Sequence, residues 1–270
     1  MDRREFLSIS AVPLTSSAIW SGTVEPAWFE LTHTSVRIPG ARKLRILHVS
    51  DIHMSDGMRA EDLETSFDAG LAQKPDLIGL TGDFVSSPWG FDKKGLDRLL
   101  RRARDTAPTF AVLGNHDYSS VRTARGRVTS SATLQDLVRR SGVRLLHNEN
   151  AVVGDLTVVG VADLWQGEFF PEKAFAGVSP AATTLVLCHN PDGKDPLLSW
   201  KWDLMLSGHT HGGQVCVPGV PPWWIPVQDK RFVAGLYEWQ DRQLFITRGI
   251  GSPRHVRAFC RPEVSIVDLV

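Results

Sequence analysis

Apolar and polar positions follow two different patterns along the chain, one before and one after about residue 150. Between residues 43 and 141, short apolar runs such as 44–50 (LRILHVS) and 76–81 (DLIGLT) are separated by segments in which apolar residues recur every three to four positions. The runs have the length of buried strands, and the recurrence is typical of helices with one apolar face. This part of the chain therefore predicts alternating strands and helices.

The first helix is predicted by a stripe of large apolar residues. Leu63, Phe67 and Leu71 recur at helical spacing, which predicts a helix over residues 60–73. The same helical spacing predicts two further helices, over residues 92–104 and 130–141. The apolar run 109–113 between them predicts a strand. The arginines of the second helix face away from its leucines, which indicates a solvated surface rather than a binding patch.

After residue 150 the pattern changes to short strands joined by turns. Residues 151–153 and 157–161 flank Gly154-Asp155, and residues 237–239 and 244–247 flank a second turn, so both pairs predict hairpins. Further buried strands are expected over residues 184–188, 203–206 and 264–269. Strand–helix alternation followed by hairpins predicts an α/β fold of two packed mixed sheets with helices outside, a four-layer α/β/β/α sandwich.

Composition excludes several classes of protein. The 270 residues carry 30 basic and 30 acidic side chains, so no overall field favours nucleic acid, and we expect no specific nucleic-acid binding. No stretch approaches the roughly 18 apolar residues of a membrane span. The cysteines are odd in number and widely spaced, at Cys188, Cys216 and Cys260, so neither a zinc ribbon nor a disulfide framework is expected.

The first twenty residues differ from the rest of the chain. Arg3-Arg4-Glu5-Phe6-Leu7 followed by a weakly apolar run resembles a twin-arginine export signal, although Asp2 stands where Ser or Thr is usual. Residues 1–20 are thus expected to direct the chain to the cell envelope. The alternatives are an N-terminal segment that touches the membrane, or a cytoplasmic protein. Residues 21–42 predict a linker and a first short strand, and residues 43–270 the main domain.

Residues that can bind metal follow five of the predicted strands. They are Asp51-x-His53, Gly82-Asp83, Gly114-Asn115-His116-Asp117, Cys188-His189 and Gly208-His209-Thr210-His211. In α/β sheets, ligands bind outside the carboxyl ends of the strands, so these residues are expected to converge. In extended chain, residues two apart point the same way, which would pair Asp51 with His53 and His209 with His211. The mixture of oxygen and nitrogen ligands suits Mn, Fe or Zn better than Ca.

Together these motifs resemble the calcineurin-like metallophosphoesterase superfamily over about residues 43–270. The segments EPAWFEL, QKPDLIGLTGD, DLW (163–165), HNPD, WDLMLSGHTHGGQ, DKRFVAG and CRPEV are similar to the bacterial YaeI-type phosphodiesterases. That branch includes chlamydial-type UDP-diacylglucosamine pyrophosphatases and exported YkuE-like enzymes. The resemblance implies a metal-dependent hydrolase that cleaves phosphodiester or pyrophosphate bonds with a metal-bound hydroxide.

The resemblance also implies a role for each motif residue. Metal one would take Asp51, His53 and His211, and metal two Asn115, His189 and His209. Asp83 would bridge the two divalent ions, with manganese favoured over iron or zinc. His116 would protonate the leaving oxygen, and Asp117 would support the site from behind.

Two alternative functions are consistent with the same motifs. The enzyme could be a UDP-diacylglucosamine pyrophosphatase of lipid A synthesis that acts on a nucleotide-lipid at a membrane surface. A non-catalytic metal-binding scaffold of the same fold is another reading, although it would tolerate loss of ligands that are all present. Trp223 and Trp224 are either a membrane anchor or, as we expect, a packed cover over the sheet. Arg248, Arg254, Arg257 and Arg261 are either anion-binding groups or surface charges.

Overall fold

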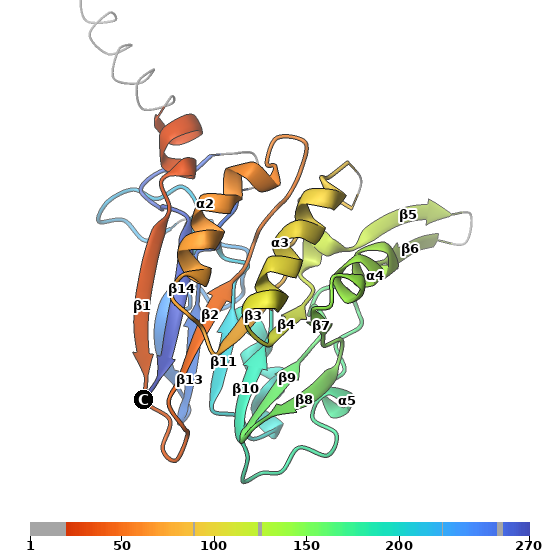
Figure 1. Ribbon diagram of the computed structural model, residues 1–270, viewed down its shortest axis with the longest axis vertical. Coiled ribbons are helices and arrows are strands. Elements are labelled where there is room, and N and C mark those ends of the chain that lie inside the picture. The colour runs from red at the N-terminus through yellow and green to blue at the C-terminus, as the bar shows by residue number, and fades with distance from the viewer. Residues whose placement is uncertain (1–19, 89, 124–125, 223, 253–255) are drawn as a thin grey trace, which may run out of the picture.

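Two six-stranded sheets lie face to face in the computed structural model, which describes residues 20–88, 90–123, 126–222, 224–252 and 256–270 (Figure 1). The first sheet has the order β1 (Glu30–Val36), β14 (Glu263–Leu269), β2 (Leu44–Val49), β3 (Leu77–Thr81), β4 (Thr109–Val112) and β7 (Arg144–Leu145). The second has the order β12 (Gly235–Trp239), β13 (Arg242–Ile246), β11 (Leu204–Ser207), β10 (Thr183–Leu187), β9 (Leu156–Gly160) and β8 (Glu149–Val153).

Both sheets are mixed, and their parallel parts bring the predicted strand ends together. β2, β3 and β4 run parallel in the first sheet, as do β10 and β11 in the second. The hairpins β8–β9 and β12–β13 are antiparallel, which confirms the two hairpin predictions. Because parallel strands end at one edge, the five motifs lie at the same end of the molecule.

The strands that carry the motifs are buried on both faces. Their inward side chains, among them Ile46, Leu77 and Leu206, form an apolar layer between the sheets. Such double burial explains why these strands read as continuous apolar runs rather than as alternating ones.

Three helices cover the outer face of the first sheet: α2 (Ala60–Leu71), α3 (Lys93–Thr106) and α4 (Ala132–Arg140). Leu63 and Phe67 of α2 are buried against this sheet, as the apolar stripe predicted. Helix α3 begins one residue after Asp92, whose carboxylate accepts a hydrogen bond from the amide of Gly95 at 2.8 Å. This cap satisfies one of the amides that a helix start leaves unpaired.

The outer face of the second sheet has a thinner cover. Trp202 and Phe175 pack there with the four-residue helix α5 (Pro171–Ala174) and the 3₁₀ turns 191–194 and 196–199. The predicted α/β/β/α fold class is confirmed, and its fourth layer consists mainly of short turns. Two strands that the apolar pattern did not predict, β5 (Ser119–Thr123) and β6 (Gly126–Ser130), form a separate hairpin.

The N-terminal stretch contributes an edge strand. Within the predicted linker, β1 pairs in parallel with β14 over seven residues, which joins the start of the described chain to its end. The proposed export signal falls almost wholly on residues 1–19, which lie outside the described residues. In the part of the chain that is described, no helix has both the length and the apolar character needed to cross a bilayer.

Candidate metal centre

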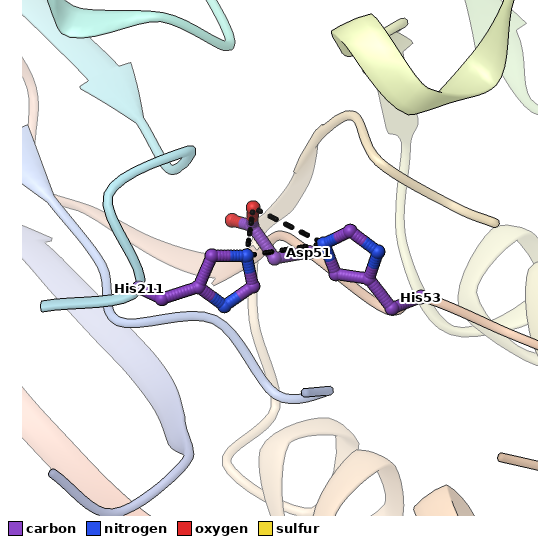
Figure 2. Close-up of side chains that lie close together, drawn as sticks. All are labelled: Asp51, His53 and His211. Atoms are coloured by element: carbon purple, nitrogen blue, oxygen red, sulfur yellow. Dashed lines mark hydrogen bonds and ion pairs between the residues drawn. The ribbon is translucent and has the colours of Figure 1, made fainter. Parts of the chain in front are cut away.

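One buried triad forms where β2 of the first sheet and β11 of the second end. The Nε2 atoms of His53 and His211 lie 3.1 Å apart, and His211 Nε2 lies 3.3 Å from Asp51 Oδ1 (Figure 2). All three side chains are buried, and their ligand atoms lie within 4.8 Å of one another. Two imidazoles and a carboxylate in this arrangement form a set of donors suited to a transition metal.

A second buried triad lies beside the first. His189 Nε2 is 3.2 Å from Asp83 Oδ2 and 3.1 Å from His209 Nδ1. The side-chain oxygen of Asn115 also lies 3.2 Å from His189 Nε2. The second set therefore brings together four side chains that follow different strands. They are Asp83 after β3, Asn115 after β4, His189 after β10 and His209 after β11.

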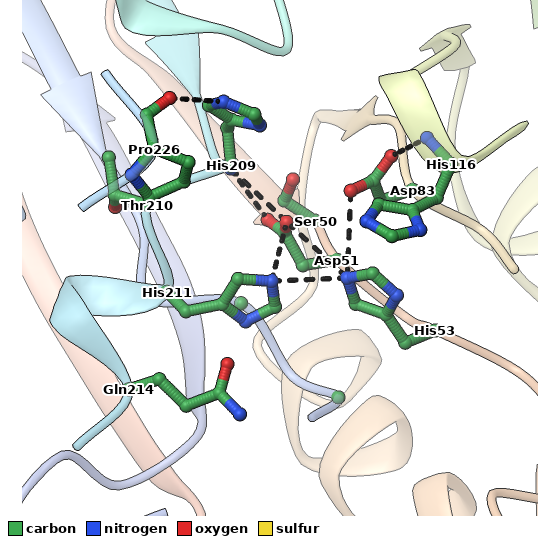
Figure 3. A network of polar contacts seen from close by, with 12 residues as sticks. Ser50, Asp51, His53, Asp83, His116, His209, Thr210, His211, Gln214 and Pro226 are labelled. Carbon is green, nitrogen blue, oxygen red and sulfur yellow. Dashed lines mark hydrogen bonds and ion pairs between the residues drawn. The ribbon is translucent and has the colours of Figure 1, made fainter. Parts of the chain in front are cut away.

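Asp83 faces both triads. Its Oδ2 atom is 3.5 Å from His53 Nε2 of the first triad (Figure 3). The same oxygen is 3.2 Å from His189 Nε2 of the second triad. One carboxylate oxygen between two sets of donors is the arrangement that a pair of neighbouring cations requires.

Hydrogen bonds behind the rings orient the donor nitrogens. His189 donates from Nδ1 to the carbonyl of Thr81 at 2.7 Å. His209 donates from Nε2 to the carbonyl of Pro226 at 2.7 Å (Figure 3). In the neutral tautomers, the lone pairs of His189 Nε2 and His209 Nδ1 then face each other. Two lone pairs at 3.1 Å repel unless a proton or a cation lies between them, so the residues fit a metal.

The backbone at the ligands is left-handed rather than extended. The φ angles are 55° at Asp51, 50° at His53, 50° at Asp83, 69° at His209 and 51° at His211. The expectation that extended chain points residues two apart the same way is therefore wrong. Asp51 and His53 do share a triad, but His209 and His211 belong to different ones. Residues other than glycine adopt such angles at a cost of about 1–3 kcal/mol each, typical of functional sites.

Two glycine-containing turns touch behind Asp83. A Cβ atom on Gly82 would lie 2.3 Å from the amide nitrogen of Gly114, and one on Gly114 would lie 2.3 Å from Asp83 Oδ1. Only glycine allows this approach, which sets the ends of β3 and β4 side by side.

His116 lies at the wall of the centre. Residues 115–117 form a 3₁₀ turn that follows β4. The amide of His116 donates to Asp83 Oδ1 at 2.8 Å, and its Nδ1 atom lies 3.1 Å from the carbonyl of Ser86. A proton on Nδ1 is held by that carbonyl, which leaves Nε2 free for chemistry.

Asp117 supports the turns from behind. Its buried carboxylate accepts hydrogen bonds from the amides of Gly114, at 2.8 Å, and Val85, at 3.2 Å. The side chain therefore ties the turn after β4 to the loop after β3, and it contacts the ligand-bearing backbone rather than the cavity.

The electrostatics of the centre favour added positive charge. Burial raises the pKa of Asp51 to about 6. Burial opposes protonation of His189, but the Asp83 carboxylate overcomes this and raises the pKa of His189 to about 10. Burial lowers the pKa values of His53 and His209 to about 3. A site that retains a proton on one histidine among neutral ones has excess negative charge, which divalent cations would neutralise.

A cavity of about 250 Å³ opens onto the centre. Asp83, Asn115 and His116 line it together with residues that the metal motifs did not include, namely Trp165, Gln214 and Trp224. Trp224 is 70% exposed, so the expected packed cover is wrong for this residue, and Trp223 lies outside the described residues. The ring of Trp165 lies 4.5 Å from that of His209, edge to face. The DLW segment was a signal for Trp165 in the sequence.

The C-terminal arginines have different environments. Arg248 pairs with Glu30 at 2.7 Å and with Glu263 at 3.0 Å. Arg257 is fully buried and donates to the carbonyls of Gly251, at 2.6 Å, and Arg248, at 2.8 Å, and its guanidinium lies 3.4 Å from His211 Nδ1. These two side chains are therefore structural rather than surface charges, and Arg254 lies outside the described residues.

Comparison with known proteins agrees with this geometry. The model of the calcineurin-like phosphoesterase family matches residues 44–213, so the chain belongs to the calcineurin-like metallophosphoesterases. Over its full length the chain is 36% identical to phosphodiesterase YaeI of Escherichia coli, which it covers completely. It is 28% identical to the metallophosphoesterase YkuE of Bacillus subtilis, over 100% of this chain and 98% of that protein. It is also 26% identical to the UDP-2,3-diacylglucosamine pyrophosphatase LpxG of Chlamydia muridarum, over 92% of each chain.

Proposed function

We propose that the protein is a dinuclear metal-dependent phosphodiesterase. The observation that carries this proposal is the position of Asp83, whose Oδ2 atom lies within 3.5 Å of a histidine nitrogen in each triad. A carboxylate shared in this way gives two cations a common ligand, and two cations a few ångströms apart suit in-line displacement at phosphorus.

The residues divide into two ligand sets. Asp51, His53 and His211 would hold metal one, and Asn115, His189 and His209 would hold metal two, with Asp83 common to both. Two divalent ions with two carboxylates leave a net positive site that attracts a phosphate anion. When bound, the ions acidify a water molecule and neutralise charge on the phosphate. Mixed oxygen and nitrogen donors suit manganese, iron or zinc better than calcium, and manganese is the metal that we propose first.

His116 supplies the proton in this proposal. It is exposed at the cavity wall, and its Nδ1 atom is held by Ser86, so Nε2 can face the leaving oxygen. A group placed within hydrogen-bond reach of that oxygen acts as a general acid. Asp83 and Asp117 position His116 through the turn that they hold.

A diester or pyrophosphate is preferred to a monoester. The similarity to phosphodiesterase YaeI supports this preference. The two tryptophans at the cavity, Trp165 and Trp224, supply apolar faces on which a second substituent of the phosphate could lie.

The test compares a diester with a monoester. We expect manganese-loaded protein to hydrolyse bis-p-nitrophenyl phosphate at least tenfold faster than p-nitrophenyl phosphate, and excess chelator to abolish both reactions. Gly22→Ala serves as a control variant that should hydrolyse both esters like the wild type, because no atom lies within 4 Å of the added methyl. Absence of turnover with manganese, iron and zinc alike would contradict the enzyme and favour a metal-binding scaffold.

A nucleotide-lipid is the second candidate substrate. It is favoured by exposed apolar side chains on the loops beside the cavity, namely Val215, Val217, Val220, Trp224 and Phe259. The similarity to LpxG, a UDP-2,3-diacylglucosamine pyrophosphatase, points the same way. Release of UMP from UDP-2,3-diacylglucosamine in detergent, and none from UDP-N-acetylglucosamine, would support this substrate. Equal rates on both would argue against recognition of acyl chains.

We also propose that residues 1–20 direct the chain to the cell envelope. Arg3-Arg4-Glu5-Phe6-Leu7 is the support for this proposal. A reporter fused to residues 1–40 is expected in the membrane or periplasmic fraction, and Arg3→Lys with Arg4→Lys should return it to the cytosol. A cytosolic reporter that the double substitution does not change would exclude the export signal.

A further inference from the structure

Two of the three cysteines meet behind the loop that carries His209 and His211. The S–H of Cys216 donates to the carbonyl of Gly212 at 3.3 Å, and the S–H of Cys260 lies 3.5 Å from the same oxygen. The two thiols also lie close enough to interact electrostatically. The S–H of Cys260 also donates to the carbonyl of the preceding residue, His211, at 3.1 Å.

The backbone aligns the two segments at this point. Val215 and Ala258 form a parallel bridge, and the amide of Cys216 donates to the carbonyl of Ala258 at 2.8 Å. The two cysteines therefore come from hydrogen-bonded neighbouring segments, and both sulfurs approach the carbonyl oxygen of Gly212.

Glycines make the room for both sulfur atoms. A Cβ on Gly212 would lie 2.9 Å from Cys260 Sγ, and a Cβ on Gly213 would lie 3.3 Å from Cys216 Sγ. The two sulfurs thus pack directly on the backbone that follows His211. A link between them would brace that backbone.

We propose that Cys216 and Cys260 form a disulfide bond that holds the His209–Gly213 loop against the segment before β14. This bond goes beyond the proposed function and does not depend on it. Cys188 differs, because it follows β10 and donates its S–H to the carbonyl of Asn190 at 3.2 Å. The odd number and wide spacing of the cysteines hid the pair from the sequence argument.

The bond forms by exchange with a small-molecule disulfide such as oxidised glutathione. The thiolate of half-buried Cys216 attacks one glutathione sulfur, and the released glutathione takes up a proton. The thiolate of Cys260 then attacks Cys216 Sγ and releases the second glutathione. Two thiols lose two electrons to the glutathione disulfide, and their two protons end on the two reduced glutathiones.

Mapping of the cysteines tests the bond directly. The full chain is incubated with oxidised glutathione, denatured, treated with N-ethylmaleimide and digested. We expect a peptide pair linking Cys216 to Cys260, lighter by two hydrogens than the sum of the reduced peptides, and alkylated Cys188. Three alkylated cysteines, a link to Cys188 or a disulfide-linked dimer would each overturn the proposal.

Stability and metal release give an independent readout. Cross-linking of a loop this long is expected to raise the melting temperature of the oxidised protein by about 5–10 °C over the reduced protein. Release of metal to a chelator should be slower in the oxidised form. Both differences should vanish in Cys216→Ser and in Cys260→Ser but persist in Cys188→Ser. A difference that survives in Cys216→Ser would place the effect elsewhere and contradict the bond.

These assays need no substrate. A failed disulfide would therefore leave the phosphodiesterase proposal standing, and an inactive enzyme would leave the disulfide standing.

Discussion

His116 is exposed to solvent, whereas His53, His189 and His209 are buried. We predict that His116→Gln retains both metals and loses about 10²–10⁴ in rate, because it removes a general acid. The loss should be large for an alkoxide or sugar leaving group, which needs a proton, and small for a nitrophenolate. Measurement of kcat on both substrate types, together with metal content, tests this. Equal losses on both, or loss of metal, would assign His116 to phosphate positioning.

The carboxylate of Asp83 lies next to a histidine of each triad. Protein purified with manganese is expected to hold about two ions per chain. Asp83→Asn should lose more metal than either His53→Ala or His189→Ala, since each histidine serves one ion. Elemental analysis of the four proteins measures this. One ion or none in the wild type would refute a dinuclear centre.

The buried carboxyl of Asp163 makes the stability of the folded protein depend on pH. Burial raises the pKa of its carboxyl to about 6, and within the described residues its Oδ2 atom has no hydrogen-bond partner. The folded protein binds this proton more tightly than the unfolded chain, so stability falls as pH rises from about 4 to 6 and stays lower above it. We predict that Asp163→Asn stabilises metal-free protein by about 1–3 kcal/mol at pH 8, but not at pH 4.

Bound metal should reverse the effect of this substitution. Asp163 interacts electrostatically with His189, so its negative charge should help to retain cations beside that residue. Urea unfolding of Asp163→Asn with chelator and with manganese, at both pH values, measures the two signs. A gain of equal size at pH 4 and pH 8 would show that the carboxyl does not titrate as stated.

At the scale of elements, the contact between the turns after β3 and β4 decides whether the triads meet. Gly114→Ala would place a methyl 2.6 Å from the amide nitrogen of Asp83, so the backbone must move. We predict a loss of about 1–3 kcal/mol in stability, together with the loss of metal two. Gly22→Ala should change neither quantity, and Gly114→Ala protein that retains two metals and wild-type stability would disprove the argument.

At the scale of the whole molecule, the centre joins the two sheets. Asp51, His53, Asp83 and Asn115 follow strands of the first sheet, and His189, His209 and His211 follow strands of the second. Manganese at 100 times its dissociation constant should therefore stabilise the folded chain by about 2.7 kcal/mol, or about 5–10 °C in melting temperature. Calorimetry with manganese and with chelator tests this. Asp83→Asn should lose most of the shift, and an unchanged wild-type melting temperature would exclude coupling between metal and fold.

The sequence alone determined which residues could form the centre and which class of fold would hold them. Apolar runs such as 44–50 must be buried, helical stripes such as Leu63 and Phe67 must face a sheet, and five polar motifs at strand ends leave little other use for their side chains. These are local properties, because an apolar run or a helical spacing of apolar residues can be recognised within a few residues.

Only the tertiary structure decided which ligand belongs to which triad. His209 and His211 are two residues apart, yet left-handed backbone turns them to different triads. Trp224 is exposed although large aromatic residues usually bury, because its loop lies at the cavity mouth. Cys216 and Cys260 meet across 43 intervening residues through one backbone bridge. In each case the cause is a contact between distant segments, or a strained φ angle that such contacts maintain. Neither leaves a repeating pattern of residues in the sequence from which it could be predicted.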